Sequence, residues 1–192
     1  MALAKYRWTA QGGFSILEVL VATTIMTVAV AGLAQMFALA TYANASARAT
    51  TYAAVLAQQK MEQLRGLTWG FDAQGLPVTD TTTDVTAVPE IASGGRGLSL
   101  SPAQSLGTNT EGYCDFVDVF GRALGGGTTP PTGTAYIRRW SIEALPGNPG
   151  NTIVLQVLVT RAGRRSGGDT SKTAAQAPEV ARLVSVKTRT AP

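Results

Sequence analysis

The sequence predicts an α+β fold in which one long N-terminal helix packs on a small antiparallel β-sheet. An uncharged stretch and then an Ala-rich amphipathic stretch precede the first proline, Pro77, so one helix can run through both. The last third alternates apolar, β-prone segments with Gly- and Pro-rich turns. The length of 192 residues suits one domain plus one appended element.

The first half of the predicted helix is long enough to cross a membrane. No charged residue occurs from Val19 to Ala47, and about 20 apolar residues span a bilayer. Lys5 and Arg7 precede this stretch without an accompanying acid. Because cytoplasmic flanks carry the excess of Lys and Arg, we expect residues 1–13 in the cytoplasm and the bulk of the chain across the membrane.

An ordinary signal-anchor helix, a buried core helix and a cleaved secretory signal peptide would share this pattern. Ala29-Val30-Ala31 and Ala38-Leu39-Ala40 both fit a signal-peptidase site. Glu18 argues against all three, because a carboxylate at the centre of a spanning helix costs roughly 2.5–3.5 kcal/mol and usually has a partner cation. No nearby residue supplies that cation.

Residues 12–22 (GGFSILEVLVA) resemble the prepilin signature of type IV pilins and type II secretion pseudopilins. The resemblance implies a pilin-like fold, with residues 1–13 as a basic leader. It also implies that an inner-membrane prepilin peptidase cuts between Gly13 and Phe14 and methylates the amine of Phe14. A cut after Gly12 would move Glu18 out of register.

The resemblance also gives Glu18 a partner, the N-terminal amine of Phe14 in a neighbouring subunit of a filament. A buried carboxylate and a buried ammonium are each costly alone, and pairing offsets much of that cost. We therefore expect Glu18 to set the register of assembly. The alternative is a glutamate that extends to the lipid headgroups.

The helix is expected to continue to Arg65, with residues 14–43 in lipid or in a filament core and residues 44–65 amphipathic. Together they make one helix of about 78 Å. Lys60 interrupts its apolar face and needs a partner, and Gly66 is a plausible stop. The segment 56–65 (LAQQKMEQLR) resembles minor pilins of the pilus-modification type and, more loosely, the I-type minor pseudopilin. The apolar face comprises Ala45, Ala49, Tyr52, Ala53, Leu56, Ala57 and Leu64.

Residues 66–192 are expected to form a β-rich globular domain. Strands are predicted at residues 113–120, 136–145, 152–160 and 180–188, and turns between the last three favour antiparallel pairing. Residues 66–112 predict a long loop region with a short strand near 85–88, and residues 125–134 predict a flexible connector. The pattern of strands from residue 136 onward also resembles the C-terminal half of the pilus-modification group.

Charge is divided along this domain. Residues 66–135 contain seven acids and two arginines, a net charge of −5, whereas residues 136–192 contain nine basic residues and three acids, a net charge of +6. The two blocks either cancel within one subunit or form separate surfaces that face one another between subunits. Because the chain's net charge is only +4, nucleic acid is not expected as a partner.

The composition argues against an enzyme. There is no histidine and one cysteine, which excludes Ser-His-Asp and Cys-His catalysis and an intrachain disulfide. Cys114 is expected to be a small core residue, and so is Trp140. Two aspartate pairs are candidate calcium ligands, but they lack EF-hand spacing, so we expect them to be solvated loop carboxylates. No metal and no cofactor is therefore expected. The pairs are Asp80 with Asp84 and Asp115 with Asp118.

The resemblance implies a minor pilin, a structural subunit of a type IV pilus. Its expected partners are the prepilin peptidase/methyltransferase, the inner membrane, and other pilin or pseudopilin subunits, which it meets through the N-terminal helix. It would lie in the bacterial inner membrane before assembly and then in a pilus or a periplasmic pseudopilus, with the globular domain outside the cytoplasm. The alternatives are an I-type minor pseudopilin of a type II secretion system and a membrane-anchored binding or adhesion module.

Overall fold

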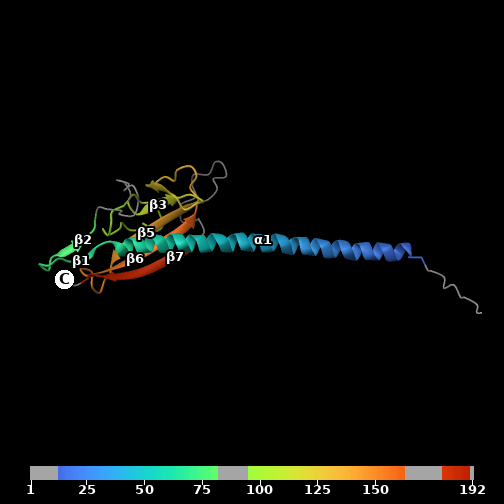
Figure 1. Ribbon diagram of the computed structural model, residues 1–192, viewed down its shortest axis with the longest axis horizontal. Coiled ribbons are helices and arrows are strands. Elements are labelled where there is room, and N and C mark those ends of the chain that lie inside the picture. The colour runs from blue at the N-terminus through green and yellow to red at the C-terminus, as the bar shows by residue number, and fades with distance from the viewer. Residues whose placement is uncertain (1–12, 82–94, 163–178, 191–192) are drawn as a thin grey trace, which may run out of the picture. The chain divides into compact units, whose positions relative to one another are not determined.

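The structure is a computed structural model that describes residues 13–81, 95–162 and 179–190. Among these residues, one helix, α1 (Ile16–Gly66), is followed by seven strands (Figure 1). A boundary between two compact units falls between Ser46 and Ala47. The strands are β1 (Trp69–Phe71), β2 (Pro77–Thr79), β3 (Cys114–Val117), β4 (Ala123–Gly126), β5 (Tyr136–Ala144), β6 (Thr152–Arg161) and β7 (Glu179–Thr188). The predicted α+β class is confirmed.

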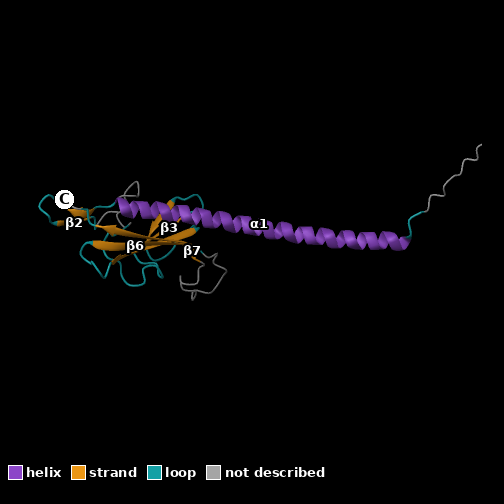
Figure 2. Ribbon diagram, turned by 90° about the horizontal axis from the view of Figure 1, so that it is seen from below, coloured by secondary structure: helices purple, strands orange, loops and turns teal. Residues whose placement is uncertain are grey.

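Helix α1, drawn in purple in Figure 2, is capped at both ends by polar groups. At its start, the backbone N–H of Leu17 donates to Ser15 Oγ over 3.3 Å, which satisfies one of the free donors of the first turn. At its end, Lys187 Nζ donates to the carbonyls of Arg65 and Leu67. A cation at this position also interacts favourably with the helix dipole, so Lys187 of β7 stabilises the end of α1.

The main sheet has five strands in the order β4-β3-β5-β6-β7, and every neighbouring pair is antiparallel. Strands β5, β6 and β7 follow one another in sequence and in space, as predicted. Strand β6 is paired on both edges, with Trp140 opposite Val157 on one side and Leu183 opposite Val157 on the other. Its nearly all-apolar side chains are buried on one face and mostly partly buried on the other.

The core lies between this sheet and the second half of α1. Helical spacing brings small and apolar residues of α1 onto one side, and alternation along β5 and β6 brings their apolar residues to meet them. Met61 joins the predicted face, whereas Ala45 is exposed. The buried set includes Ala53, Leu56, Ala57, Met61 and Leu64 of α1, and Trp140, Ile142, Ile153, Leu155, Val157 and Val159 of the sheet.

Two parts of the predicted loop regions were wrong. Strands β1 and β2 form an antiparallel hairpin inside the segment predicted as a long loop. Strand β4 occupies the start of the predicted flexible connector and pairs with β3. The strand predicted at 113–120 is shorter, since β3 covers Cys114–Val117. The strand predicted near 85–88 lies outside the described residues.

Cys114 is a buried core residue, as predicted. Its side chain is fully covered and packs with Phe116 and Ile137 on the sheet face opposite α1. Burial raises the pKa of the Cys114 thiol from 9.0 to about 12, and the charge of Asp115 adds to the shift while Arg139 and Lys60 oppose it. The thiol is therefore protonated and inaccessible in the folded chain.

Cys114 is expected to report on folding. In the native chain iodoacetamide at pH 8 should leave the thiol unmodified, whereas in urea it should react completely, because the exposed thiol ionises near its ordinary pKa. Since the folded state holds this proton more tightly than the unfolded state, the free energy of unfolding should fall as pH rises from about 9 towards 12. Mass spectrometry after alkylation tests this, and fast labelling of the native chain at pH 8 would contradict it.

Candidate functional site

The predicted cleavage junction lies directly before α1. Gly13, Phe14 and Ser15 lie outside any helix or strand, and α1 begins at Ile16. Phe14 is 83% exposed, and an added Cβ at Gly13 would have no neighbour within 4 Å. The described part of the chain therefore leaves this peptide bond accessible to a protease.

Glu18 lies in the first turn of α1 and is exposed. A carboxylate is favourable there because the free N–H groups of the first turn carry partial positive charge. None of the ion pairs found among the described residues involves Glu18. Its carboxylate is therefore free to meet a cation from outside the described chain.

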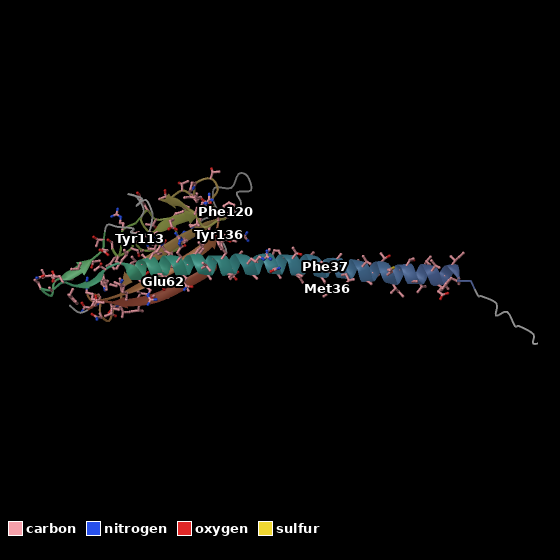
Figure 3. The ribbon with its side chains drawn as sticks, viewed as in Figure 1. Met36, Phe37, Glu62, Tyr113, Phe120 and Tyr136 are labelled. Carbon is pink, nitrogen blue, oxygen red and sulfur yellow. The ribbon has the colours of Figure 1, made fainter. Side chains whose placement is uncertain are left out.

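The first half of α1 presents large apolar side chains on all sides. The most apolar window of the helix has a mean hydropathy of 2.1 and none of it is buried. Figure 3 shows Met36 and Phe37 projecting from this stretch. An apolar surface of this extent requires lipid or other helices around it. The exposed set is Phe14, Ile16, Leu17, Val19, Leu20, Val21, Ile25, Met26, Val28, Val30, Leu33, Met36, Phe37, Leu39 and Tyr42.

The threonines in this stretch donate their hydroxyl groups to backbone carbonyls of the same helix. Thr24 donates to the carbonyl of Leu20 over 2.8 Å, Thr27 to Thr23 over 2.7 Å, and Thr41 to Phe37 over 2.8 Å. An unsatisfied hydroxyl in an apolar environment would be costly. These bonds therefore make the uncharged stretch compatible with a membrane or a filament core despite its polar residues.

Comparison with known protein families identifies the N-terminal segment. The family model described as "Prokaryotic N-terminal methylation motif" matches residues 8–34. The chain carries the type IV pilin and pseudopilin signature. No curated protein and no solved structure matches the chain.

The pilin signature covers the accessible junction and Glu18 together. It implies processing by a prepilin peptidase and assembly with other pilins. With the long apolar helix, it also indicates membrane anchoring before assembly. The signature is that of a family of structural subunits. Gly13, Phe14 and Glu18 therefore form the candidate site for processing and assembly.

The globular unit of this pilin-like chain contains a buried charge cluster that the sequence analysis missed. Asp115 of β3 accepts two hydrogen bonds from Arg138 of β5, from Nε over 2.7 Å and from Nη2 over 2.8 Å. Lys60 Nζ of α1 lies 3.5 Å from Asp115 Oδ2 and 3.8 Å from the centre of the Trp140 ring. We call Lys60, Asp115, Arg138 and Trp140 the helix clasp, because they join α1 to the sheet.

The expectation that Asp115 is a solvated loop carboxylate was wrong. Asp115 is 7% exposed, and both of its oxygens are engaged by cations of this chain. Lys60 finds the partner that the sequence required. Lys60 interrupts the apolar face of the helix, and Arg138 interrupts the apolar face of a predicted strand. Charged residues on faces that are otherwise apolar were the signal in the sequence that could have predicted the helix clasp.

Three other aspartates accept hydrogen bonds from backbone N–H groups of the same chain. Asp72 Oδ1 accepts N–H bonds from Gln74 and Leu76, and Asp80 Oδ2 accepts one from Thr68. Asp118 Oδ1 accepts N–H bonds from Phe120 and Arg122 in the turn after β3. In the helix clasp, Asp115 of the acidic block pairs with Arg138 of the basic block, so the two blocks meet within one chain. Asp84 lies outside the described residues.

Proposed function

We propose that this chain is a minor pilin, a structural subunit of a type IV pilus. The observation that carries the proposal is the methylation motif, which covers the start of an exposed apolar helix that continues without a break to Gly66. In this proposal residues 1–13 are a cleaved leader and residues 14–43 are the membrane or filament-core half of the helix. Residues 44–65 are its amphipathic half, and residues 66–192 are the globular domain outside the cytoplasm.

The processing and assembly residues are part of the same proposal. Prepilin peptidase cuts between Gly13 and Phe14 and methylates the new amine of Phe14. Glu18 then pairs with that amine in a neighbouring subunit. The exposure of Phe14 and Glu18 and the open surroundings of Gly13 support these roles.

The assignment to the pilus-modification type rests on the resemblance of residues 56–65 and of the C-terminal strands. In the structure Leu56, Met61 and Leu64 are core residues, and Lys60 belongs to the helix clasp. Packing on the sheet alone therefore accounts for much of that pattern. For this reason the I-type minor pseudopilin remains the second candidate within the family.

Purification of surface filaments separates these candidates. The full chain, produced at its natural level, is expected to appear in pili sheared from the cell surface, as detected by an antibody. The matched sample is the membrane fraction of cells that lack the pilus assembly machinery, where the chain should remain. Recovery with a secretion apparatus and absence from the pili would favour the pseudopilin. An unprocessed chain in the membrane would favour the binding module.

A further inference from the structure

The turn between β3 and β4 is a rigid structure that presents apolar side chains to solvent. Asp118 Oδ1 accepts N–H bonds from Phe120 and Arg122, each over 2.8 Å, and the backbone N–H of Asp118 donates to the carbonyl of Arg122. Gly121 has a φ of +83°, which disfavours any other residue there, and it lies against Tyr52 of α1. The conformation of the turn is therefore fixed.

Two large apolar residues project from this turn. Val119 is 63% exposed and Phe120 is 75% exposed. Phe120 is labelled in Figure 3. The guanidinium of Arg122 lies 5.5 Å from the centre of the Phe120 ring. We call Val119, Phe120 and Arg122 the apolar tip. A fixed turn that holds such side chains outward loses little conformational entropy on binding, which favours a role in recognition.

A complementary surface lies at the other edge of the same sheet. Val184 and Val186 of β7 are 59% and 58% exposed on the face turned away from α1. Val186 is paired with Val154 of β6, which is itself paired with Glu143 of β5, so the exposed carboxylate of Glu143 borders the valines. We call Glu143, Val154, Val184 and Val186 the valine face.

We propose that the apolar tip of one copy of this chain docks on the valine face of the next copy. Val119 and Phe120 would cover the exposed valines, and Arg122 would lie beside Glu143. The cation Arg182 donates a hydrogen bond to Gln156 and lies two cross-strand rows of this face away from Glu143. Glu143 therefore makes one end of the valine face acidic, and Arg122 suits that end. This inference rests on the proposed function, since it assigns a contact between subunits of one filament.

The strand order supports a contact that repeats. The apolar tip adjoins β4 at one edge of the sheet, and the valine face includes β7 at the other edge. A contact between two different surfaces can continue from copy to copy into a helical filament. Antiparallel pairing of two β7 edges would instead reverse the direction of α1 between the copies, which helices inserted from one side of a membrane do not allow.

Chemical crosslinking of the full chain tests this contact. Val119→Cys and Val184→Cys are combined in one chain, purified in detergent micelles and treated with a short bismaleimide, while the buried Cys114 stays unmodified. We expect a ladder of dimers, trimers and larger products, because each copy offers both reactive positions. Each single variant should give dimers at most. The matched control combines Val184→Cys with Leu100→Cys, whose native side chain is 58% exposed away from the apolar tip, and it should give no ladder.

A charge exchange then tests the predicted ion pair. Arg122→Glu and Glu143→Arg should each reduce the crosslinked fraction roughly tenfold, because like charges then oppose one another, and the combined variant should restore it. Arg161→Glu, at an exposed cation outside both surfaces, is the control. Absence of a ladder, an equal ladder in the Leu100 control, or no effect of Arg122→Glu would overturn the contact.

Recovery of the same variants in pili separates this inference from the proposed function. A chain that enters pili without forming a ladder overturns the contact and leaves the proposed function in place. A chain that forms the ladder but never enters pili supports the contact and argues against the minor pilin.

Discussion

Replacing Asp115 by alanine is expected to lower the free energy of unfolding of the globular unit by about 3–5 kcal/mol. The variant leaves Lys60 and Arg138 buried without the carboxylate that engages both of them. Pulsed alkylation of Cys114 along a urea series measures the loss in the full chain. Because this cost is comparable to the whole stability of a small domain, native Cys114 protection at low urea would itself be reduced.

Two further variants show whether the charge or the packing matters. Lys60→Met keeps the apolar stem and should cost less, because Asp115 retains its two bonds from Arg138. Glu111→Ala, at an exposed acid, should change the stability by no more than about 0.5 kcal/mol. Equal losses for Asp115→Ala and Glu111→Ala would show that the helix clasp contributes nothing specific.

Replacing Glu18 by valine is expected to leave membrane insertion intact and to reduce incorporation into filaments roughly a hundredfold or more. The membrane segment becomes more apolar, so insertion is not weakened. In the filament, however, the buried amine of a neighbouring Phe14 loses its partner, and an unpaired buried charge costs several kcal/mol. Quantitative immunoblots of the membrane fraction and of sheared pili measure the two effects separately.

Glu62→Val provides the matched control, since Glu62 is an exposed glutamate in the same helix and pairs with Arg65. It should enter filaments normally. Normal incorporation of the Glu18→Val chain would refute the role of Glu18 as the residue that sets register.

The long helix and the three C-terminal strands were predictable because their signals are local. A run without charge or proline identifies α1, and alternation of apolar residues between turn signals identifies β5, β6 and β7. The hairpin of β1 and β2 was not predictable, since its strands are three residues long and depend on distant contacts. Arg189 holds them by stacking 3.7 Å from the centre of the Trp69 ring and donating to the carbonyls of Gly70 and Val78.

Strand β4 escaped prediction for a different reason. Its glycines favour flexible turns, and Gly125 has a φ of +104°. Pairing with β3 outweighs that preference. Predicting the helix clasp would require knowing which charged residues on apolar faces lie opposite one another. Sequence periodicity gives the face on which each residue lies but not its partner. The candidate site at Gly13, Phe14 and Glu18, in contrast, lies within one short sequence motif, so its residues could be proposed from the sequence alone.

The mass of the mature N-terminus tests the central claim most directly. Full chain isolated from cells that make prepilin peptidase should begin at Phe14 and carry one added methyl group on its amine. A bulky residue in place of Gly13 should leave the leader uncut, whereas Gly13→Ala should still be processed because the side chain stays small. A native chain that retains residues 1–13, or one that begins at Gly32 or Thr41 after a signal-peptidase cut, would contradict the account.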